Sequence, residues 1–405
     1  MTNTASPSLP TIPTTPPGRM GRGAALWLNA SILVAYLAAS TAPSPLYALY
    51  REAWGFSALT LTVVFSTYAF ALLGALLFFG ALSDHRGRRA VVLVSLGLEI
   101  ASLLVFRHAD AISWLVVARA VQGVATGIAT SALSAGMLDI DRERGSLLNS
   151  VSPLVGMGVG ALGAGALAQF APAPTRLVFD VLLAILAAQA LAAFFLPETV
   201  SKRPGALAAM KPQLAVPARA WPTLWQVLPV NTAQWALGGF YASLGPSLAR
   251  IVTGIHSPLI GGGVVATLVL AGAAAVLAVR TRPARAVLAG GTAALIVGLG
   301  VTLGGVELHS TAMFFAGSFI AGLGFGGAFN GTMRTLVPLA EAHERAGLMS
   351  TFFVLSYLAF SVPAIAAGVM AGRFGLQAAS VGYGLVLVTL GVVALAMMAR
   401  QKAAG

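Results

Sequence analysis

Apolar runs of about 20 residues recur along almost the whole chain, and they constrain its fold more than any other feature. Runs such as "TLTVVFSTYAFALLGALLFF" and "AVVLVSLGLEIASLLVF" are long enough to span a bilayer as helices. Only 9% of the 405 residues are charged and 58% are hydrophobic, whereas about a quarter of a soluble chain is charged. We therefore predict an all-α integral membrane protein.

Hydropathy along the chain predicts twelve membrane spans. They cover residues 25–49, 58–82, 90–106, 112–137, 146–170, 177–196, 222–249, 257–279, 286–305, 311–335, 346–371 and 376–398. The seventh is the least apolar, because Asn231, Gln234 and Pro246 interrupt it. The predicted organisation is a disordered N-terminal tail over 1–23, a six-helix bundle over 24–197, a Pro-rich linker over 198–221, a second six-helix bundle over 222–399 and a C-terminal tail over 400–405.

The distribution of positive charge predicts the topology. An even number of spans places both termini on one side of the membrane, and most of the 24 lysines and arginines lie in the loops on that side. Loops rich in Lys and Arg stay in the cytoplasm, so we expect both termini in the cytoplasm of a bacterial-type inner membrane. The net charge of +12 is then a consequence of topology. We expect a lipid bilayer and no nucleic acid as the partner.

The two halves of the chain resemble each other. A single offset aligns "ERGSLLNS" (143–150) with "ERAGLMST" (344–351), Pro45 with Pro246, and Gly123 with Gly324. The shared offset predicts a duplicated six-helix unit, although Gly- and Ala-rich composition could produce some of the matches. Parallel six-helix repeats with a binding site near the midplane are typical of transporters.

The most charged decapeptide, "GALSDHRGRR" at residues 80–89, lies between the second and third spans. It fits the pattern Gly-x-Leu-x-Asp-x-x-Gly-Arg-Arg and resembles the signature of the major facilitator superfamily. The resemblance implies twelve helices in two pseudo-symmetric six-helix bundles. It also implies a latch in which the acid and the arginines of this loop hold the cytoplasmic ends of the bundles together. The predicted latch comprises Gly80, Asp84, Gly87, Arg88, Arg89 and, at the end of span four, Asp139.

Span four, "LVVARAVQGVATGIATSALSAG", carries an arginine at membrane depth. It has Arg-x-x-x-Gly with Gln before the Gly, which resembles a second signature of the superfamily, found in proton-coupled members. An arginine is costly inside a membrane and usually faces a wet interior. Helical spacing places Arg119, Gln122 and Thr126 on one face. Arg119 could bind an anionic group, modulate proton transfer, or serve as a structural arginine.

Span five is rich in small residues, with Gly156, Gly160, Gly163 and Gly165. It partly matches the antiporter signature of the superfamily, but Ala161 stands where that signature has proline. Small residues at this spacing also simply allow close helix packing. The pattern therefore favours export only mildly.

Two acids lie within predicted spans, Glu99 in span three and Asp180 in span six. Isolated intramembrane acids are candidate proton carriers, although either could be a structural ion-pair partner. A cavity for a small amphipathic molecule is predicted from aromatic and weakly polar residues facing the centre. These are Asn29, Tyr36, Ser40, Arg119, Gln122, Thr126, Gln234, Tyr241, Ser243, Phe315, Phe319 and Asn330.

These features together predict a secondary-active transporter that exports a small amphipathic organic molecule in exchange for protons, functional as a monomer. The alternative is a proton-coupled importer of a nutrient or organic anion, with Arg119 as the anion ligand. The chain has no cysteine, no phosphate-binding loop and no metal-ligand spacing among its five histidines. We therefore expect no enzymatic activity, no cofactor and no metal.

Overall fold

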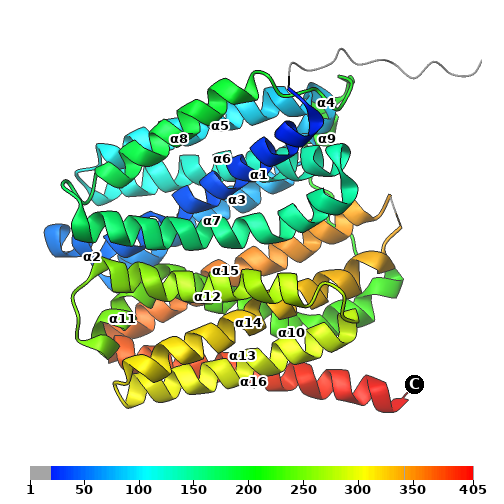
Figure 1. The fold of residues 1–405 in the computed structure, drawn as a ribbon. Coiled ribbons are helices and arrows are strands. Elements are labelled where there is room, and N and C mark those ends of the chain that lie inside the picture. Colours follow the sequence, from blue (N-terminus) through cyan, green and yellow to red (C-terminus); the bar gives the residue numbers. More distant parts are fainter. Residues whose placement is uncertain (1–19, 342, 405) are drawn as a thin grey trace, which may run out of the picture.

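The computed structural model describes residues 20–341 and 343–404, and every regular element within them is a helix (Figure 1). Most of the predicted N-terminal tail lies outside the described residues. The first half of the chain forms α1 (Arg22–Thr41), α2 (Pro43–Trp54), α3 (Ala58–Phe79), α4 (Leu82–Arg86), α5 (Arg88–Arg107), α6 (Ile112–Ile140), α7 (Arg142–Phe170) and α8 (Leu177–Ala193). The connector contains α9 (Ala206–Ala209) and the 3-10 helix η1 (Ala218–Ala220).

The second half follows the same order. It forms α10 (Trp221–Ser243), α11 (Gly245–Thr253), α12 (Pro258–Ala278), α13 (Ala284–Glu307), α14 (Thr311–Leu336), the 3-10 helix η2 (Val337–Leu339), α15 (Arg345–Phe374) and α16 (Leu376–Ala404). The last helix continues past residue 398, where the sequence predicted the end of the final span.

Two predicted spans are each divided into a long and a short helix. The predicted span 25–49 is α1 followed by α2, with Pro43 as the first residue of α2, and the predicted span 222–249 is α10 followed by α11, with Pro246 in its first turn. Proline has no N–H to continue the hydrogen-bond ladder of the preceding helix, and its ring clashes with the preceding turn. The equivalent break in both halves agrees with the predicted duplication.

Ten helices among the described residues are long and apolar enough to cross a membrane, with α1 and α2 taken as one. The other two of the twelve predicted spans correspond to α8 and α10. The helix α8 is apolar but has only 17 residues, whereas α10 has 23 residues and contains the polar side chains that interrupt the seventh predicted span. The twelve-helix arrangement is therefore confirmed, with these two helices as its least typical members.

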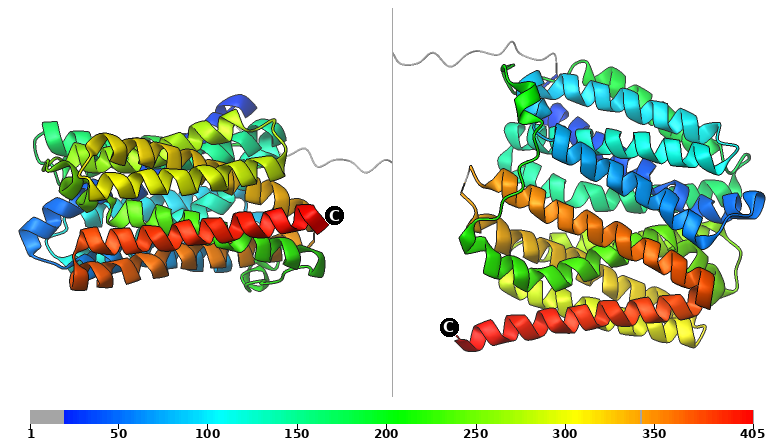
Figure 2. Two further views of the ribbon diagram at one scale, coloured as in Figure 1. Left: turned by 90° about the horizontal axis from the view of Figure 1, so that it is seen from below. Right: turned by 180° about the vertical axis from the view of Figure 1, so that it is seen from behind.

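The helices form two bundles that lie side by side (Figures 1 and 2). In the first bundle α3 and α5 pack on α6, and α1 packs on α7; in the second, α13 packs on α14 and α10 packs on α15. The bundles meet where α7 packs on α12 and where α3 packs on α15. The start of α1 and the end of α16 lie at one end of the molecule, whereas α2 and α11 lie at the other. The connector crosses between the bundles at the end with the termini.

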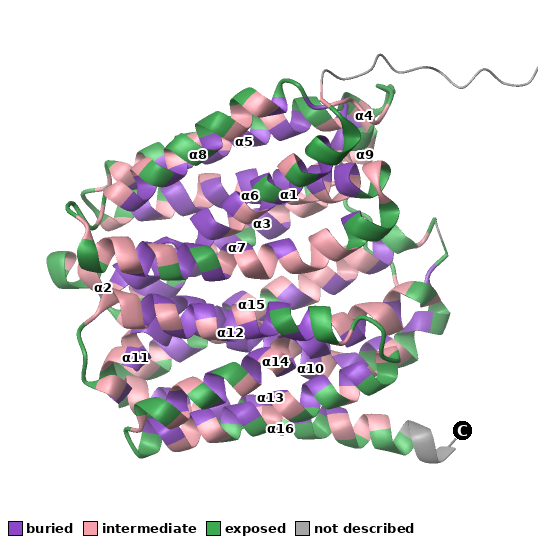
Figure 3. Ribbon diagram, viewed as in Figure 1, coloured by how far each residue is buried: buried purple, intermediate pink, exposed green. Residues whose placement is uncertain are grey.

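The outer surface of the bundles is apolar. Buried residues gather along the middle, and exposed ones lie on the outer sides of helices such as α8 and α16 (Figure 3). Many exposed side chains on α8, α13 and α16 are large and hydrophobic, including Leu191, Val297 and Val386. Such a surface suits hydrocarbon and not water. The chain is a multi-pass membrane protein.

Candidate functional site

Arg119 lies at the centre of the first bundle, on α6, and no part of it is exposed. Its Nε donates to Tyr47 Oη at 2.7 Å, and its Nη1 donates to the Ser40 carbonyl oxygen at 2.7 Å. The guanidinium carbon also lies 5.5 Å from the ring centres of Tyr47 and Tyr68 and 5.6 Å from that of Phe106. Aromatic faces attract a cation, so four helices besides α6 contribute to holding this charge.

A buried acid is linked to the arginine through one amide side chain. Arg119 Nη1 donates to Gln122 Oε1 at 2.9 Å, and Gln122 Nε2 donates to Glu99 Oε1 at 3.1 Å. Arg119 and Gln122 are three residues apart on α6 and therefore share a face, while Glu99 comes from α5 and is fully buried. The network thus links opposite charges across two helices without direct contact between them.

The network is incompletely satisfied. Within the described residues, Glu99 Oε2 and Arg119 Nη2 are buried and have no hydrogen-bond partner. A buried charged group that lacks partners is costly.

A second cluster lies at the end of the molecule that carries the termini, around α4. Arg88 Nη1 contacts Asp84 Oδ1 at 2.5 Å and donates to Ser83 Oγ at 2.6 Å, and its Nε contacts Asp139 Oδ2 at 3.2 Å. These contacts tie α4, α5 and the end of α6 together. Among the described residues, the ion-pair partners of Arg88 all belong to the first bundle.

Glu198, which follows α8, caps the first turn of α5 beside this cluster. Its carboxylate accepts from the backbone N–H groups of Arg88 at 2.7 Å and Arg89 at 3.3 Å, where a helix N-terminus favours a negative charge. Gly87 precedes this turn with φ of 93°, and a Cβ there would lie 2.5 Å from Glu198 Oε2. Glu198 was not among the predicted site residues, and its only signal was its place directly after the sixth span.

The connector forms polar contacts with both bundles. Near its start, Arg203 N donates to the His85 carbonyl oxygen at 3.0 Å, and the His85 Nδ1 atom lies 3.1 Å from the Pro204 carbonyl oxygen. Near its end, Arg219 pairs with Glu344 and donates to the Leu339 carbonyl oxygen at 2.6 Å.

Half-buried aromatic side chains of the second bundle meet the first bundle near the middle of the molecule. Trp235 of α10 stands edge-on to Tyr357 and Phe360 of α15, with ring centres 5.0 and 5.9 Å apart. Phe360 in turn lies 5.1 Å from Phe65 of α3. These residues were not predicted from the sequence, because aromatic residues on apolar helices give no sign of which face they occupy.

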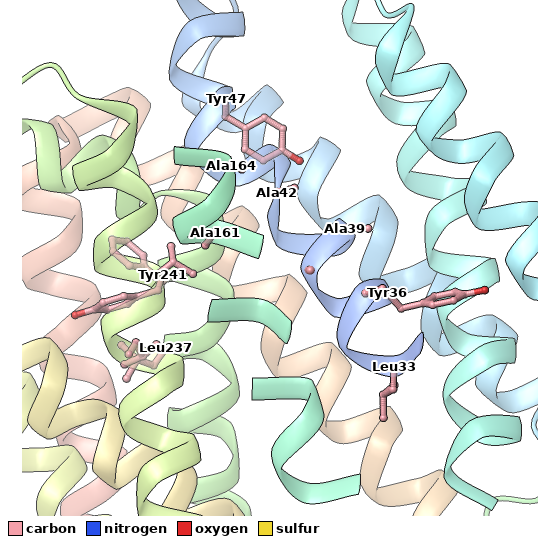
Figure 4. Close-up of a cluster of buried hydrophobic side chains, with 14 of the residues drawn as sticks. Leu33, Tyr36, Ala39, Ala42, Tyr47, Ala161, Ala164, Leu237 and Tyr241 are labelled. Carbon is pink, nitrogen blue, oxygen red and sulfur yellow. The ribbon is translucent and has the colours of Figure 1, made fainter. Parts of the chain in front are cut away.

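The structure separates several predicted cavity residues. Tyr36 donates to Ser95 Oγ of α5 at 3.1 Å, whereas Tyr241 lies 2.8 Å from Ser318 Oγ of α14. The two rings point away from each other, with Ala161 and Ala164 of α7 between the helices that carry them (Figure 4). Each tyrosine is therefore directed into its own bundle, away from a shared central face.

The other predicted cavity residues divide into three groups. Ser40, Thr126 and Ser243 donate their hydroxyls to carbonyl oxygens of their own helices, as Asn29 does with its amide. Gln234 donates to Asn231, while its own Oε1 and Asn330 Oδ1 are buried without partners among the described residues. Phe315 packs against the apolar core, and Phe319 is 49% exposed.

Asp180 and the glycines of α7 have distinct surroundings. Asp180 forms an ion pair with Arg107 of α5, and both side chains are partly exposed, which matches the structural alternative for this acid.

The glycines of α7 differ in how closely other helices approach them. Cβ atoms at Gly156 and Gly160 would meet α1, and one at Gly165 would lie 2.7 Å from the Pro258 carbonyl oxygen of α12. Gly163 has no atom within 4 Å of its Cβ position and makes no close helix contact.

Comparison with known proteins decides the family. The family model described as Major Facilitator Superfamily matches residues 28–307. The chain belongs to the Major Facilitator Superfamily. A search of curated protein sequences gave no match.

Solved structures of Major Facilitator Superfamily transporters share the fold at low sequence identity. A bacterial homolog to the human lysosomal transporter Spinster, in an inward-facing and unoccupied conformation, has a TM-score of 0.75 at 15% identity and covers 93% of this chain and 97% of its own. A mutant of the nucleoside transporter NupG has a TM-score of 0.71 at 11% identity, and the human organic anion transporter MFSD10 has 0.68 at 18%. Each of these two covers 93% of this chain and 100% of its own.

The two charged clusters lie in the same half of the superfamily fold. The Arg88 cluster and the Arg119 network both lie in the first bundle, and α5 and α6 contribute to both. The aromatic side chains of α10 and α15 belong to the second bundle. The buried Arg119 network therefore lies in the first bundle, whereas most of the aromatic cluster around Trp235 lies in the second.

Proposed function

We propose that this chain is a secondary-active transporter that exports a small amphipathic organic molecule in exchange for protons. In this proposal, the bundles over residues 24–197 and 222–399 rock about a site between them and expose it to each side in turn. The transporter works as a monomer in a bacterial-type inner membrane, with both termini in the cytoplasm, and performs no catalytic step.

The observation that carries proton coupling is the buried Glu99 carboxylate with one unpartnered oxygen. When Glu99 is ionised, Gln122 links it to Arg119, whose own contacts reach Ser40 of α1 and Tyr47 of α2. Protonation removes the negative charge from this chain of hydrogen bonds. The resulting change reaches the break between α1 and α2, so proton binding biases the arrangement of those helices.

The burial of Arg119 favours proton coupling over direct binding of an anionic substrate. Its guanidinium is enclosed by Tyr47, Tyr68 and Phe106 and has no exposed surface. The half-buried aromatic side chains around Trp235 and Tyr357 offer the transported molecule an apolar, flat-sided surface instead. Aromatic faces suit an amphipathic compound with a planar or cationic part.

The Arg88 cluster supports the proposed latch at the end with the termini. Asp84, Arg88 and Asp139 already form a connected set of charges there. We propose that the same charges contact the second bundle when the two bundles close at that end, and that they keep to their own bundle when it is open.

The experiment is substrate-induced proton movement in everted vesicles. A respiration-driven pH gradient is followed with a fluorescent dye while amphipathic cations, organic anions, sugars and amino acids are added. The expected result is collapse of the gradient by one compound class, its loss in Glu99→Gln, and its retention in Glu307→Gln. Glu307 is the matched control because it is an exposed acid at the end of α13.

Two outcomes would contradict the proposal. Collapse of the gradient that survives in well-inserted Glu99→Gln protein would exclude Glu99 as the proton carrier. The second outcome is that intact cells accumulate a radiolabelled compound under a proton gradient while everted vesicles show no response. That result would assign the chain to import.

A further inference from the structure

The two bundles are joined by an ion pair at the end of the molecule where α2 and α11 lie. Arg250 Nη2 of α11 contacts Glu52 Oε1 of α2 at 2.5 Å. Among the ion pairs of the described residues, this is the one that links the first bundle directly to the second; the others lie within a bundle or tie the connector to one. Glu52 remains 59% exposed, whereas Arg250 is only 22% exposed.

A cavity of about 560 Å³ opens beside this ion pair and takes its walls from both bundles. Its polar lining consists of Arg51, Glu52, Ser247, Arg250 and His256, and alanine, isoleucine and leucine side chains supply the remainder. Two permanent positive charges thus face one negative charge. Its volume lies within the range that holds small organic molecules.

The two arginines occupy the same place relative to the ends of α2 and α11. Gly55 N donates to the Arg51 carbonyl oxygen at 2.9 Å, and Gly254 N donates to the Arg250 carbonyl oxygen at 3.0 Å. Both glycines end their helices with nearly the same left-handed φ, 67° and 68°. A positive charge in the last turn favours a helix end, but that effect does not require both side chains to line one cavity.

The ends of α2 and α11 differ in one charge at the cavity. Glu52 follows Arg51, whereas the apolar Ile251 follows Arg250. The single carboxylate pairs with Arg250, and Arg51 has no ion-pair partner among the described residues. The Glu52 carboxylate therefore occupies a position where a carboxylate from another molecule could contact Arg250, with Arg51 free to contact it as well.

We propose that this cavity is an anion-binding vestibule. The anionic group of a small organic molecule binds Arg51 and Arg250 and replaces Glu52 as the partner of Arg250, while its organic part lies against the apolar walls. Guanidinium groups bind carboxylates in a bidentate manner. Because replacement breaks the ion pair between the bundles, anion binding and separation of the bundles at this end are thermodynamically linked.

That linkage rests on the proposed alternating access, but the vestibule can be tested without transport. The chain has no cysteine, so Ser247→Cys places a single thiol in the cavity of the full-length purified protein. Its labelling rates by an anionic and by a cationic methanethiosulfonate reagent are compared. Ser310→Cys is the matched control, since Ser310 lies at the same end of the molecule, before α14 and outside the cavity.

We expect the anionic reagent to be favoured at residue 247, relative to residue 310, by roughly tenfold, the scale on which charged clefts concentrate ions. Arg51→Gln in this background should reduce the preference, and Glu52→Gln should increase it. Equal preference at residues 247 and 310, in protein that elutes and melts like the parent, overturns the proposal.

Ligand protection tests the chemical class. Benzoate should slow labelling at residue 247, more strongly in Glu52→Gln and less in Arg51→Gln, while neutral benzamide should not. Protection by both compounds, or by neither, overturns the proposal. Benzoate protection in a protein that fails the everted-vesicle assay would retain the vestibule and reject proton exchange. Collapse of the pH gradient in everted vesicles, without benzoate protection, would retain proton exchange and reject the vestibule.

Discussion

The interior of the first bundle holds one basic and one acidic side chain, and each can compensate the charge of the other. Arg119 and Glu99 are fully buried, and both form hydrogen bonds with the Gln122 side chain. Removing one member of a buried ionic set leaves the other uncompensated, which costs more than removing both. The consequence can be measured independently of transport.

We expect Arg119→Gln to lower the free energy of unfolding by about 3–5 kcal/mol, because the remaining Glu99 charge loses its counterpart. The double variant Glu99→Gln/Arg119→Gln should lose less than the sum of the two single changes. Chemical denaturation in detergent micelles measures both values. Arg373→Gln, at an exposed arginine in the last turn of α15, serves as control, and additive losses would argue against the network.

Gly87 carries the backbone geometry on which the Arg88 cluster depends. A side chain there would be strained at φ of 93° and would also meet the Glu198 carboxylate. Gly87→Ala should therefore destabilise the protein by about 1–3 kcal/mol. Gly97→Ala, within α5 and with no atom within 4 Å of the added carbon, should be neutral or slightly stabilising. Thermal unfolding of the two variants under identical conditions compares them, and equal effects would contradict this role.

At the scale of helices, α13 and α14 pack through glycines spaced by seven residues. Gly291, Gly298 and Gly305 lie on α13, and Gly317, Gly324 and Gly331 lie on α14. A Cβ at Gly298 would lie 2.5 Å from Ala321 Cα, and one at Gly324 would lie 2.6 Å from Leu295 Cα. Small residues at this spacing allow the backbones of membrane helices to approach closely.

Gly324→Val should separate α13 from α14 and lower stability by about 1–3 kcal/mol, as overpacking against backbone atoms does. Gly300→Val, on α13 in open space, should change stability much less. Thermal unfolding in detergent followed by circular dichroism distinguishes the two. Comparable losses would indicate that valine itself, and not the contact, is responsible.

The helices were more predictable from sequence than the site because a membrane requires long apolar runs, whatever they pack against. Proline positions could also have indicated the breaks at Pro43 and Pro246. Partners across helices left no such signal: Glu99 and Gln122 are 23 residues apart. The resemblance to the superfamily signature located Asp84 and Arg88, but the contact between the Arg88 backbone and Glu198 depends on the return of the chain after α8.

At the scale of the whole molecule, the bundles touch through small residues near the α2–α11 end. A Cβ at Gly262 of α12 would lie 2.9 Å from the Ala161 carbonyl carbon of α7, and one at Gly368 of α15 would lie 3.1 Å from the Ala58 carbonyl oxygen of α3. The approach at Gly262 brings backbone against backbone, and at Gly368 the Thr62 side chain of α3 also contacts the added carbon. Closure at this end therefore leaves no room for added volume.

Gly262→Val should hold the bundles apart at the α2–α11 end. Spin labels on Asp110→Cys and Leu308→Cys, which lie in exposed loops of the two bundles at that end, report the separation by double electron–electron resonance. The distance distribution should shift to longer values. Gly263→Val is the control, because its Cβ would lie 3.9 Å from Phe315, and an equal shift in both variants would refute the contact.

The hydrogen bonds at the two ends of the connector limit how far apart the bundles can move in the proposed alternating access. Between the contact at Pro204 and that at Arg219 lie 14 residues, which reach about 50 Å when fully extended. The helix α9 shortens that reach as long as it remains folded. In the proposed alternating access, the connector therefore sets a maximum separation of the bundles at this end, and chain length fixes that maximum together with the contacts at the two ends of the connector.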